Sequence, residues 1–351
     1  MKYSYLITLK PLEPFFFGGE FTFGADESRQ ETSRYSATST EFPQQTALLG
    51  MLRKTLLIQN GHLTMHKKGE WVDSTGRGTQ SKNYDNAKAL VGTDAFSYEK
   101  AIDLGIIDSL SPLFIKDKSN NFFIANAKDR DFEIKEIEGK VSIGNGQHKA
   151  FVFEGYDAKE SNHKGYISTS KDLKDFSDFF KEVETVGIKK SQSGESEEDA
   201  FFRKKSHVPK DGESFAFIAT FSQEIEWEKQ SLVSLGADQS SFILKIEAYD
   251  HEFKTVFNGV HEAKKSSRIV LASQTLLSQE AYALCFFVLG ERKPYRQLVN
   301  AKKGTKSKRY YLLEKGSVLY TEELEKLEKM LNQKHLRAIG INHYFTIKGK
   351  K

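Results

Sequence analysis

Nine histidines are the side chains in this 351-residue sequence best suited to general base catalysis or metal binding. They are His62, His66, His148, His163, His207, His251, His261, His335 and His343. None falls into the HExxH, HxE…CxxC or paired cysteine and histidine spacings that hold zinc. His62 and His66 are four residues apart, but Gly61 and Thr64 interrupt a helix there, which favours a solvated loop over a metal site. Cys285 is the only cysteine, so we expect no metal and no other cofactor.

Glycine-containing loops beside basic residues are the more informative feature, since neither a Walker loop nor a GxSxG elbow occurs. Such loops can present backbone N–H groups and cations to phosphates. They lie at residues 16–19, 187–190, 200–207 and 339–343. The third loop mixes aromatic and basic residues, and single-stranded RNA is held by stacking on aromatics together with phosphate neutralisation. Each loop alone is more typical of an ordinary surface turn, but together they indicate RNA.

The overall charge is a weaker indicator of the partner. A net charge of +4 and a pI near 8.7 are only mildly basic. The densest basic run, residues 302–309, fits either a nucleic-acid contact or a solvated lead into a hairpin, and we favour the second slightly. Phe15, Phe16 and Phe17 are expected to seal a strand-to-loop corner rather than stack on bases. No secretory signal or membrane span is recognisable, so the protein is expected to be cytoplasmic.

The first part of the chain reads as strand, long loop, helix and hairpin. Residues 3–10 alternate apolar and polar side chains, which is typical of a half-buried strand. Residues 46–58 place Leu49, Leu52 and Leu56 on one helical stripe. Residues 113–115 and 122–124 predict a hairpin, and residues 215–221 a further strand. The stretches 60–94 and 139–211 are polar, and we interpret both as loop-like.

The second part repeats this order. Residues 242–246 and 269–271 predict strands, and residues 279–289 a buried helix capped by Ser278. Residues 310–313 and 318–320 predict a hairpin around Gly316, followed by a helix over 322–332 capped by Thr321 and a strand over 344–347. The expected fold class is therefore α+β, with two tandem ferredoxin-like (RRM-like) domains that carry long inserted loops and hairpins. We place the domains at residues 1–228 and 229–351.

Six sequence blocks carry a resemblance to a known family. They are residues 12–19 (LEPFFFGG), 42–53 (FPQQTALLGMLR), 186–188 (VGI), 235–238 (LGAD), 315–320 (KGSVLY) and 339–342 (IGIN). In order and spacing these blocks resemble subunit three of the Cmr module, the type III-B CRISPR effector complex of the RAMP superfamily. Ala237 and Asp238 depart from the family's Gly-Glu, and His343 stands where a basic residue is common.

The resemblance implies a non-catalytic RAMP protein that binds the 5′ handle of the crRNA in antiviral defence. It also implies contact with the large cyclase/polymerase-type subunit and with the first backbone RAMP subunit, and catalysis would belong to those neighbours. Carried over by position, the residues expected to contact RNA are Gly18, Gly19, Arg53, Gly187, Lys189, Arg203, Lys204, Gly340 and Asn342.

Two other functions stay open at this point. The first is a metal-independent RAMP endoribonuclease that processes precursor crRNA, with a histidine or tyrosine as general base and a lysine that stabilises the transition state; His207, beside Arg203 and Lys204, or His343 would be the residues concerned. The second is a protein adaptor whose basic loops face an acidic partner. Cleavage of repeat RNA in EDTA would favour the endoribonuclease, and failure to retain RNA would favour the adaptor.

Overall fold

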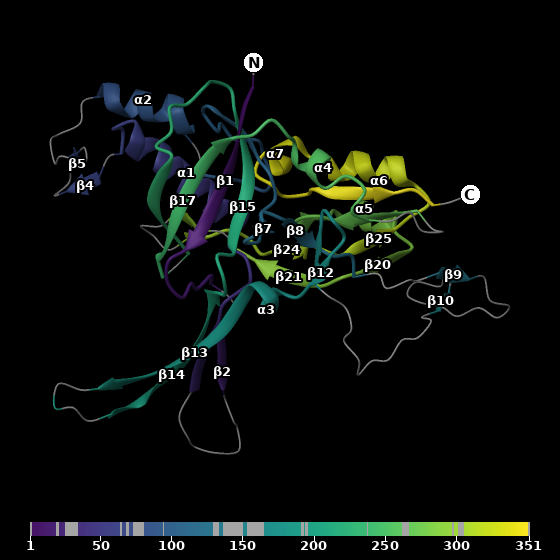
Figure 1. The fold of residues 1–351 in the computed structure, drawn as a ribbon, viewed down its shortest axis with the longest axis horizontal. Helices are drawn as coiled ribbons and strands as arrows, with labels where there is room; N and C mark the ends of the chain where they lie inside the picture. Colours follow the sequence, from purple (N-terminus) through teal and green to yellow (C-terminus); the bar gives the residue numbers. More distant parts are fainter. Residues whose placement is uncertain are drawn as a thin grey trace.

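A nine-stranded sheet runs through the centre of the molecule (Figure 1). The structure, a computed structural model, describes residues 2–18, 21–24, 34–63, 65–67, 70–72, 81–93, 95–128, 133–135, 150–152, 165–190, 193, 196–236, 238–261, 267–296, 298–300 and 305–349. In spatial order the strands are β12 (Leu173–Lys174), β11 (Tyr166–Ser168), β8 (Phe122–Ala125), β7 (Phe114–Lys116), β15 (Ser214–Phe221), β1 (Tyr3–Pro11), β17 (Ser240–Ala248) and β16 (Gln230–Leu235), while β6 (Ile107–Leu110) pairs with β15. All these pairs are antiparallel.

Strand β1 lies in the middle of this sheet because it can bury side chains on both faces. Ile7 and Leu9 join the main core together with the apolar stripe of α1 (Gln45–Gln59). Leu6, on the opposite face, joins a second core with Phe253 of α4 (Phe253–Val256). The predicted first strand and first helix are confirmed, as are the hairpin of β7 and β8 and the strand β15.

A second sheet of four strands lies toward the C-terminal end. Its order is β20 (Phe287–Leu289), β25 (Val318–Tyr320), β18 (Arg268–Leu271) and β26 (Tyr344–Ile347). Helices α5 (Gln279–Ala283) and α6 (Leu324–Leu331) contribute Ala281, Leu327 and Leu331 to the core on one face of this sheet. The short helix α7 (Lys334–Arg337) follows, and Leu110 N–H donates to the Ala338 carbonyl at 2.8 Å, which ties the two sheets together.

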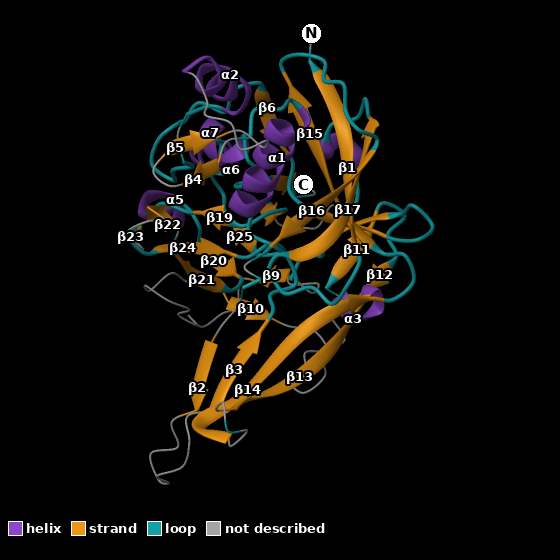
Figure 2. Ribbon diagram, turned by 90° about the vertical axis from the view of Figure 1, so that its left-hand side faces the viewer, coloured by secondary structure: helices purple, strands orange, loops and turns teal. Residues whose placement is uncertain are grey.

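A long hairpin projects from the body, as Figures 1 and 2 show. It consists of β13 (Phe180–Lys190) and β14 (Ser196–Pro209), extended by β3 (Arg34–Thr38), which is parallel to β14, and by β2 (Phe21–Gly24). The one-turn helix α3 (Phe176–Phe179) leads into it. The prediction of loop over this region was wrong, because a ribbon exposed on both faces has none of the apolar alternation by which strands are recognised.

Smaller elements complete the fold. They are β4 (Met65–Lys67) with β5 (Glu70–Val72), α2 (Ser81–Val91), β9 (Glu133–Lys135) with β10 (Ala150–Val152), the sheet of β19 (Thr275–Leu276), β24 (Tyr310–Leu313) and β21 (Arg292–Tyr295), and β22 (Leu298–Asn300) with β23 (Thr305–Lys306). Helix α2 and the β4–β5 pair lie where a loop was predicted.

Three further predictions were wrong in the second part of the chain. The helix expected over 279–289 ends at Ala283, and residues 287–289 form β20 instead; Ser278 does cap α5, accepting the Ala281 N–H at 3.2 Å. Strands β24 and β25 do not form a hairpin, because they pair in different sheets. Helix α6 begins after Glu323, so the Thr321 hydroxyl binds the Glu323 N–H rather than capping the helix.

The fold class is α+β, as predicted. Strands β16 and β17, which follow the predicted domain boundary, pair in the same sheet as β1. The division at residues 228 and 229 stays a prediction.

Candidate nucleic-acid interface

The hairpin presents two chemically different faces. Neighbouring residues on a strand point to opposite faces, so Gly187 and Phe202, which are directly paired, share one face with Lys204. Arg203 and Lys205 lie on the other face, where they form ion pairs with Glu184 at 3.6 Å and Glu182 at 2.9 Å. Arg203 and Lys204, both predicted to bind RNA, therefore point in opposite directions.

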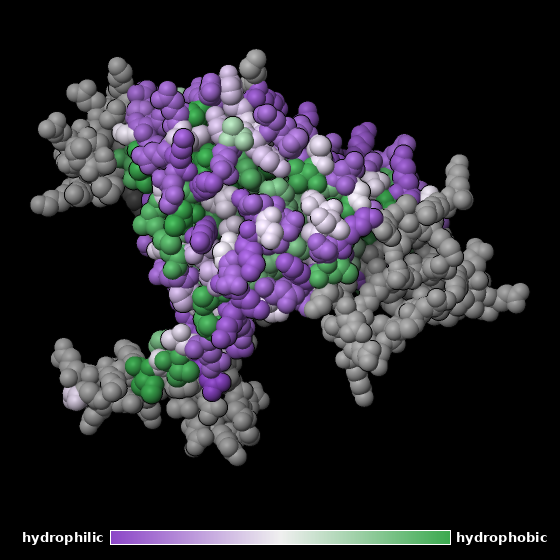
Figure 3. All heavy atoms as spheres, in the orientation of Figure 1, coloured by the Kyte–Doolittle hydropathy of each residue, from purple (hydrophilic) through white to green (hydrophobic). Residues whose placement is uncertain are grey.

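The first face carries an aromatic ring whose far end lies over a glycine. A Cβ atom at Gly187 would stand only 2.1 Å from Cζ of Phe202, so the ring covers the position that a side chain would fill. The Phe202 side chain stays 39% exposed, although it is apolar. An exposed ring of this kind can stack on a base. Figure 3 shows hydrophobic surface on this projecting part of the molecule.

Lys204 lies on the same face as Phe202 and contacts the body of the protein. Its ammonium group pairs with Asp238 and lies 4.9 Å from the centre of the Phe16 ring. Phe15, Phe16 and Phe17 are themselves buried, which confirms that they seal the corner beneath the hairpin. Because the Lys204 side chain is one-third exposed, its charge is available at the surface.

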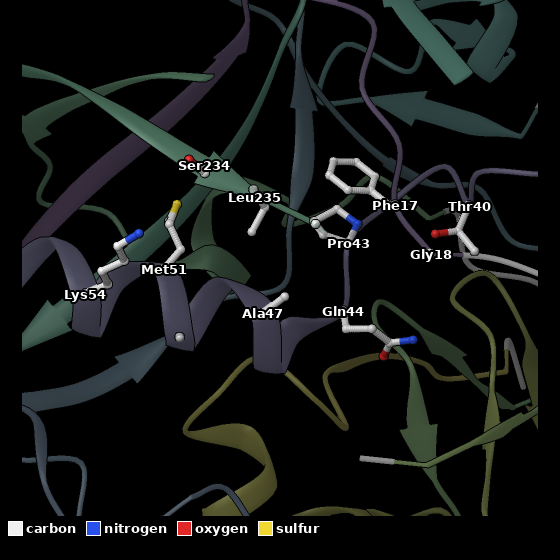
Figure 4. A pocket seen from close by; sticks show the side chains of 12 residues that line it. Phe17, Gly18, Thr40, Pro43, Gln44, Ala47, Met51, Lys54, Ser234 and Leu235 are labelled. Atoms are coloured by element: carbon white, nitrogen blue, oxygen red, sulfur yellow. The ribbon is translucent and has the colours of Figure 1, made fainter. Parts of the chain in front are cut away.

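A cavity of about 370 Å³ opens beside this corner (Figure 4). Gly18 and Gly236 line it together with Thr40, and α1 contributes Lys54. Gly236 has φ +87°, and a Cβ there would stand 2.6 Å from the Phe16 carbonyl, so the close approach requires glycine. Helix α1 begins at the cavity without a side-chain cap at Gln44, and an uncapped helix start favours anions.

Helix α1 turns Lys54, rather than the predicted Arg53, toward this cavity. The residues of α1 on the cavity side are Ala47, Gly50, Met51 and Lys54, which is the spacing of one helix face. Arg53 lies on another face, where its Nη2 donates to the Asp103 carbonyl at 3.0 Å. The same spacing could have selected Lys54 from the sequence, had the cavity side of the helix been known.

Gly340 and Asn342 lie away from the hairpin and hold packing together. A Cβ at Gly340, where φ is +82°, would stand 2.6 Å from the Ser111 carbonyl. Asn342 is fully buried; its Oδ1 accepts the Leu276 N–H at 2.8 Å, and its Nδ2 donates to the Leu276 carbonyl at 3.3 Å. Neither is brought together with Gly18, Gly187 or Lys204. Gly19 and the side chain of Lys189 lie outside the described residues.

The two histidines that could serve an endoribonuclease have ring nitrogens that are buried or contact the backbone. His207 is 7% exposed between the rings of Phe15 and Phe176, neither of its ring nitrogens has a hydrogen-bond partner within the described ranges, and burial lowers its pKa. Nε2 of His343 lies 3.0 Å from the Arg337 carbonyl, and burial lowers its pKa to about 4. A general base must reach its substrate, and neither ring is placed to do so in this conformation.

The described residues offer neither a metal site nor a membrane-spanning helix. Among them, no three histidine, cysteine, aspartate or glutamate side chains converge as metal ligands would. None of the helices in that part of the chain has the length and apolar character that a bilayer crossing requires.

The fold of this chain is similar to that of chains in two solved structures of type III-B assemblies. One is from a structure titled the type III-B Cmr-beta bound to cognate target RNA, with a TM-score of 0.52 and 12% identity over 97% of this chain and 96% of that chain. Another is from the same assembly with target RNA and AMPPnP, state 1, with a TM-score of 0.50, 12% identity and the same coverage. At this identity the likeness shows the fold alone.

The sequence profile of the CRISPR-associated protein family Cas_Cmr3 matches residues 156–348, more than half of the chain, and the chain belongs to this family. The resemblance to subunit three of the Cmr module is thereby confirmed, and the protein is a subunit of a type III CRISPR effector complex of the Cmr kind. Among curated proteins, no sequence matches it.

Proposed function

We propose that this chain is a non-catalytic subunit that binds the 5′ handle of the crRNA and anchors the large cyclase/polymerase-type subunit to the backbone RAMP subunits in antiviral defence. The observation that carries the proposal is the hairpin face on which Phe202 lies over Gly187 beside Lys204. A ring for a base and a cation for a phosphate, side by side, match the two ways in which single-stranded RNA is held.

The cavity beside this face supports the same proposal. The rim residues Gly18 and Gly236 leave backbone exposed, and Lys54 adds a cation. The uncapped start of α1 favours a phosphate group at this place. We therefore propose that the RNA strand passes from the cavity mouth over Lys204 to Phe202.

The arrangement of the two larger sheets supports the finer fold hypothesis of two ferredoxin-like domains. Each sheet is antiparallel, and helices cover a face of each: α1 the first, α5 and α6 the second. The non-catalytic role is supported by the burial of His207 and by the surroundings of the half-buried His343, whose Nδ1 is buried and whose Nε2 lies 3.0 Å from the Arg337 carbonyl.

RNA binding by the full chain tests the proposal. Labelled repeat RNA should bind with an affinity that falls steeply with salt, and Lys204→Ala should reduce the slope of log Kd against log salt by about one. Lys245→Ala is the matched control, since Lys245 also lies on a strand and pairs with a carboxylate, Glu247, at 2.7 Å. This control should leave binding unchanged.

Equal effects of the two lysine variants would contradict the proposal. So would specific cleavage of the repeat RNA in EDTA that His207→Ala abolishes, which would establish the endoribonuclease instead. Absence of RNA binding by the chain and by its assembled complex would favour the protein adaptor.

A further inference from the structure

Strand β16 forms one edge of the central sheet, and none of its residues is of a type that hinders pairing with a further strand. It pairs with β17 only, within the described residues, and its six residues, Gln230 to Leu235, include no charge and no proline. Proteins usually protect exposed edges with charged residues, prolines or very short strands. The opposite edge follows that rule, because β12 is two residues long and ends in Lys174.

The pairing with β17 tells which backbone groups of β16 point outward. The Ile246 N–H donates to the Lys229 carbonyl at 3.2 Å, so Lys229 and Ile246 form a hydrogen-bonded pair. Such pairs alternate along an antiparallel ladder. The N–H and C=O groups of Gln230, Leu232 and Ser234 must therefore point away from β17, and these are also the exposed residues of the strand.

Apolar side chains flank this outward edge. Leu232 is 69% exposed, and Ile58, on α1 across the edge, is 52% exposed. Between α1 and β16 lies a cavity of about 100 Å³ that both residues line. Figure 3 shows hydrophobic surface on the side of the molecule where Figure 1 places β17.

The cavity also contains polar atoms without partners. Both atoms of the Gln59 side-chain amide are buried, as is the Ser231 hydroxyl, and none of them has a hydrogen-bond partner in the described part of the chain. Buried polar groups are nearly always paired in a finished structure. The N–H and C=O groups of a peptide backbone that lies along this open edge could form hydrogen bonds with the Gln59 amide and the Ser231 hydroxyl.

We propose that β16 is a docking edge on which an extended segment of a neighbouring protein subunit of the effector complex pairs as an additional strand. Main-chain hydrogen bonds to Leu232 and Ser234 would hold it. Apolar side chains on one face of the added strand would pack on Leu232, and those on its other face on Ile58 of α1. The proposal rests on the role of this chain as an anchoring subunit.

Charge favours a protein strand over RNA at this edge. Lys54 and Glu228 line the cavity, both exposed and neither with an ion-pair partner among the residues described. Lys54 also lines the larger cavity, where it is proposed to meet RNA, so Glu228 is the charge that belongs to this edge alone. The strand itself is neutral, so a polyanion is repelled rather than bound here. A strand with a neutral centre and a basic side chain facing Glu228 is complementary.

Hydrogen exchange of the unmodified protein tests this directly. The amides of residues 230–235 should exchange faster in the isolated full chain than in the complex assembled from the co-expressed subunits of its CRISPR locus. Unchanged exchange in this segment on assembly would overturn the proposal. Protection of residues 230–233 by handle RNA alone would also overturn it, as would self-association of the isolated chain, detected by light scattering, that Leu232→Pro abolishes.

Proline and alanine variants of the same residue distinguish a contribution of backbone hydrogen bonds from a contribution of side-chain packing. Leu232→Pro and Ser234→Pro remove outward N–H groups that β17 does not use, and proline is tolerated on edge strands. Each should lower co-purification with the other subunits about tenfold, while Leu232→Ala and Ser234→Ala stay within about threefold of the parent chain. Equal co-purification of proline and alanine variants would refute the pairing.

The test of the docking edge gives a result that is separate from the test of RNA binding. Leu232→Pro should bind repeat RNA as the parent chain does, which also shows that this variant folds; Ser234 lines the larger cavity and is left out of this comparison. If Lys204→Ala left RNA binding unchanged while residues 230–235 were still protected on assembly, the docking edge would stand and the handle-binding role would fall.

Discussion

The ring of Phe202 owes its position to the absence of a side chain at Gly187, and this can be tested by filling that space. Gly187→Ala would place a methyl group 2.1 Å from Cζ of Phe202, so the ring must swing away. If the ring stacks on a base, its displacement should weaken RNA binding by about 1 to 3 kcal/mol, or about fivefold to a hundredfold in Kd. Phe202→Ala should produce a loss of the same size.

A double-mutant cycle decides whether the two residues act as one unit. In fluorescence anisotropy with labelled repeat RNA at fixed salt, the variant with both substitutions should bind about as weakly as either single variant. Ile188→Ala is the matched control, because Ile188 is 51% exposed and follows Gly187 on β13, so its side chain points to the face of the hairpin opposite to Phe202. Additive losses, or a loss in Ile188→Ala equal to that in Phe202→Ala, would refute the reasoning.

Three other predictions concern a charge, a turn and a buried histidine. Asp238→Asn removes the ion-pair partner of Lys204 and should tighten RNA binding by up to about fivefold in the same assay; weaker binding would contradict it. Gly340→Ala, with a Cβ 2.6 Å from the Ser111 carbonyl, should lower the free energy of unfolding by about 2–4 kcal/mol in denaturant titrations while RNA affinity is retained. His343 has its pKa lowered by burial to about 4, so the unfolded chain binds a proton between pH 6.5 and 4 that the folded chain does not. Stability should fall as the pH drops through this window, and His343→Gln should flatten that dependence; an unchanged slope would refute the assignment.

The core elements could be predicted because their environment imposes a period on the sequence. Helix α1 buries Leu49, Leu52 and Leu56, and this spacing, typical of a helix packed on one side, is the one that predicts it. The prediction for residues 279–289 was wrong because this segment has no such period. Its continuous apolar run fits a buried helix or a buried strand equally well, and the pairing of β20 with β25 decided in favour of a strand at residues 287–289.

Glycines near basic residues were weaker guides, because a glycine has several physical uses. Gly187 provides room for a ring, Gly236 allows two backbone segments to approach, and Gly340 adopts a left-handed φ in a packed turn. Sequence alone does not separate these uses, since each depends on which atoms lie opposite in the folded chain. The sequence therefore predicts Gly340 and Asn342 at the RNA, whereas the structure places Gly340 against Gln45 of α1 and Asn342 against Leu276 of β19.

The run Arg203-Lys204-Lys205 illustrates the same limit for charge. In the sequence these three residues form one cluster of cations. On a strand their side chains point to two different faces: Lys204 contacts Asp238 and the Phe16 ring, whereas Arg203 and Lys205 pair with glutamates on the other face of the hairpin. A ligand that lies on one face of the hairpin meets one of these charges, so the salt dependence of RNA binding should report about one phosphate contact from this run rather than three.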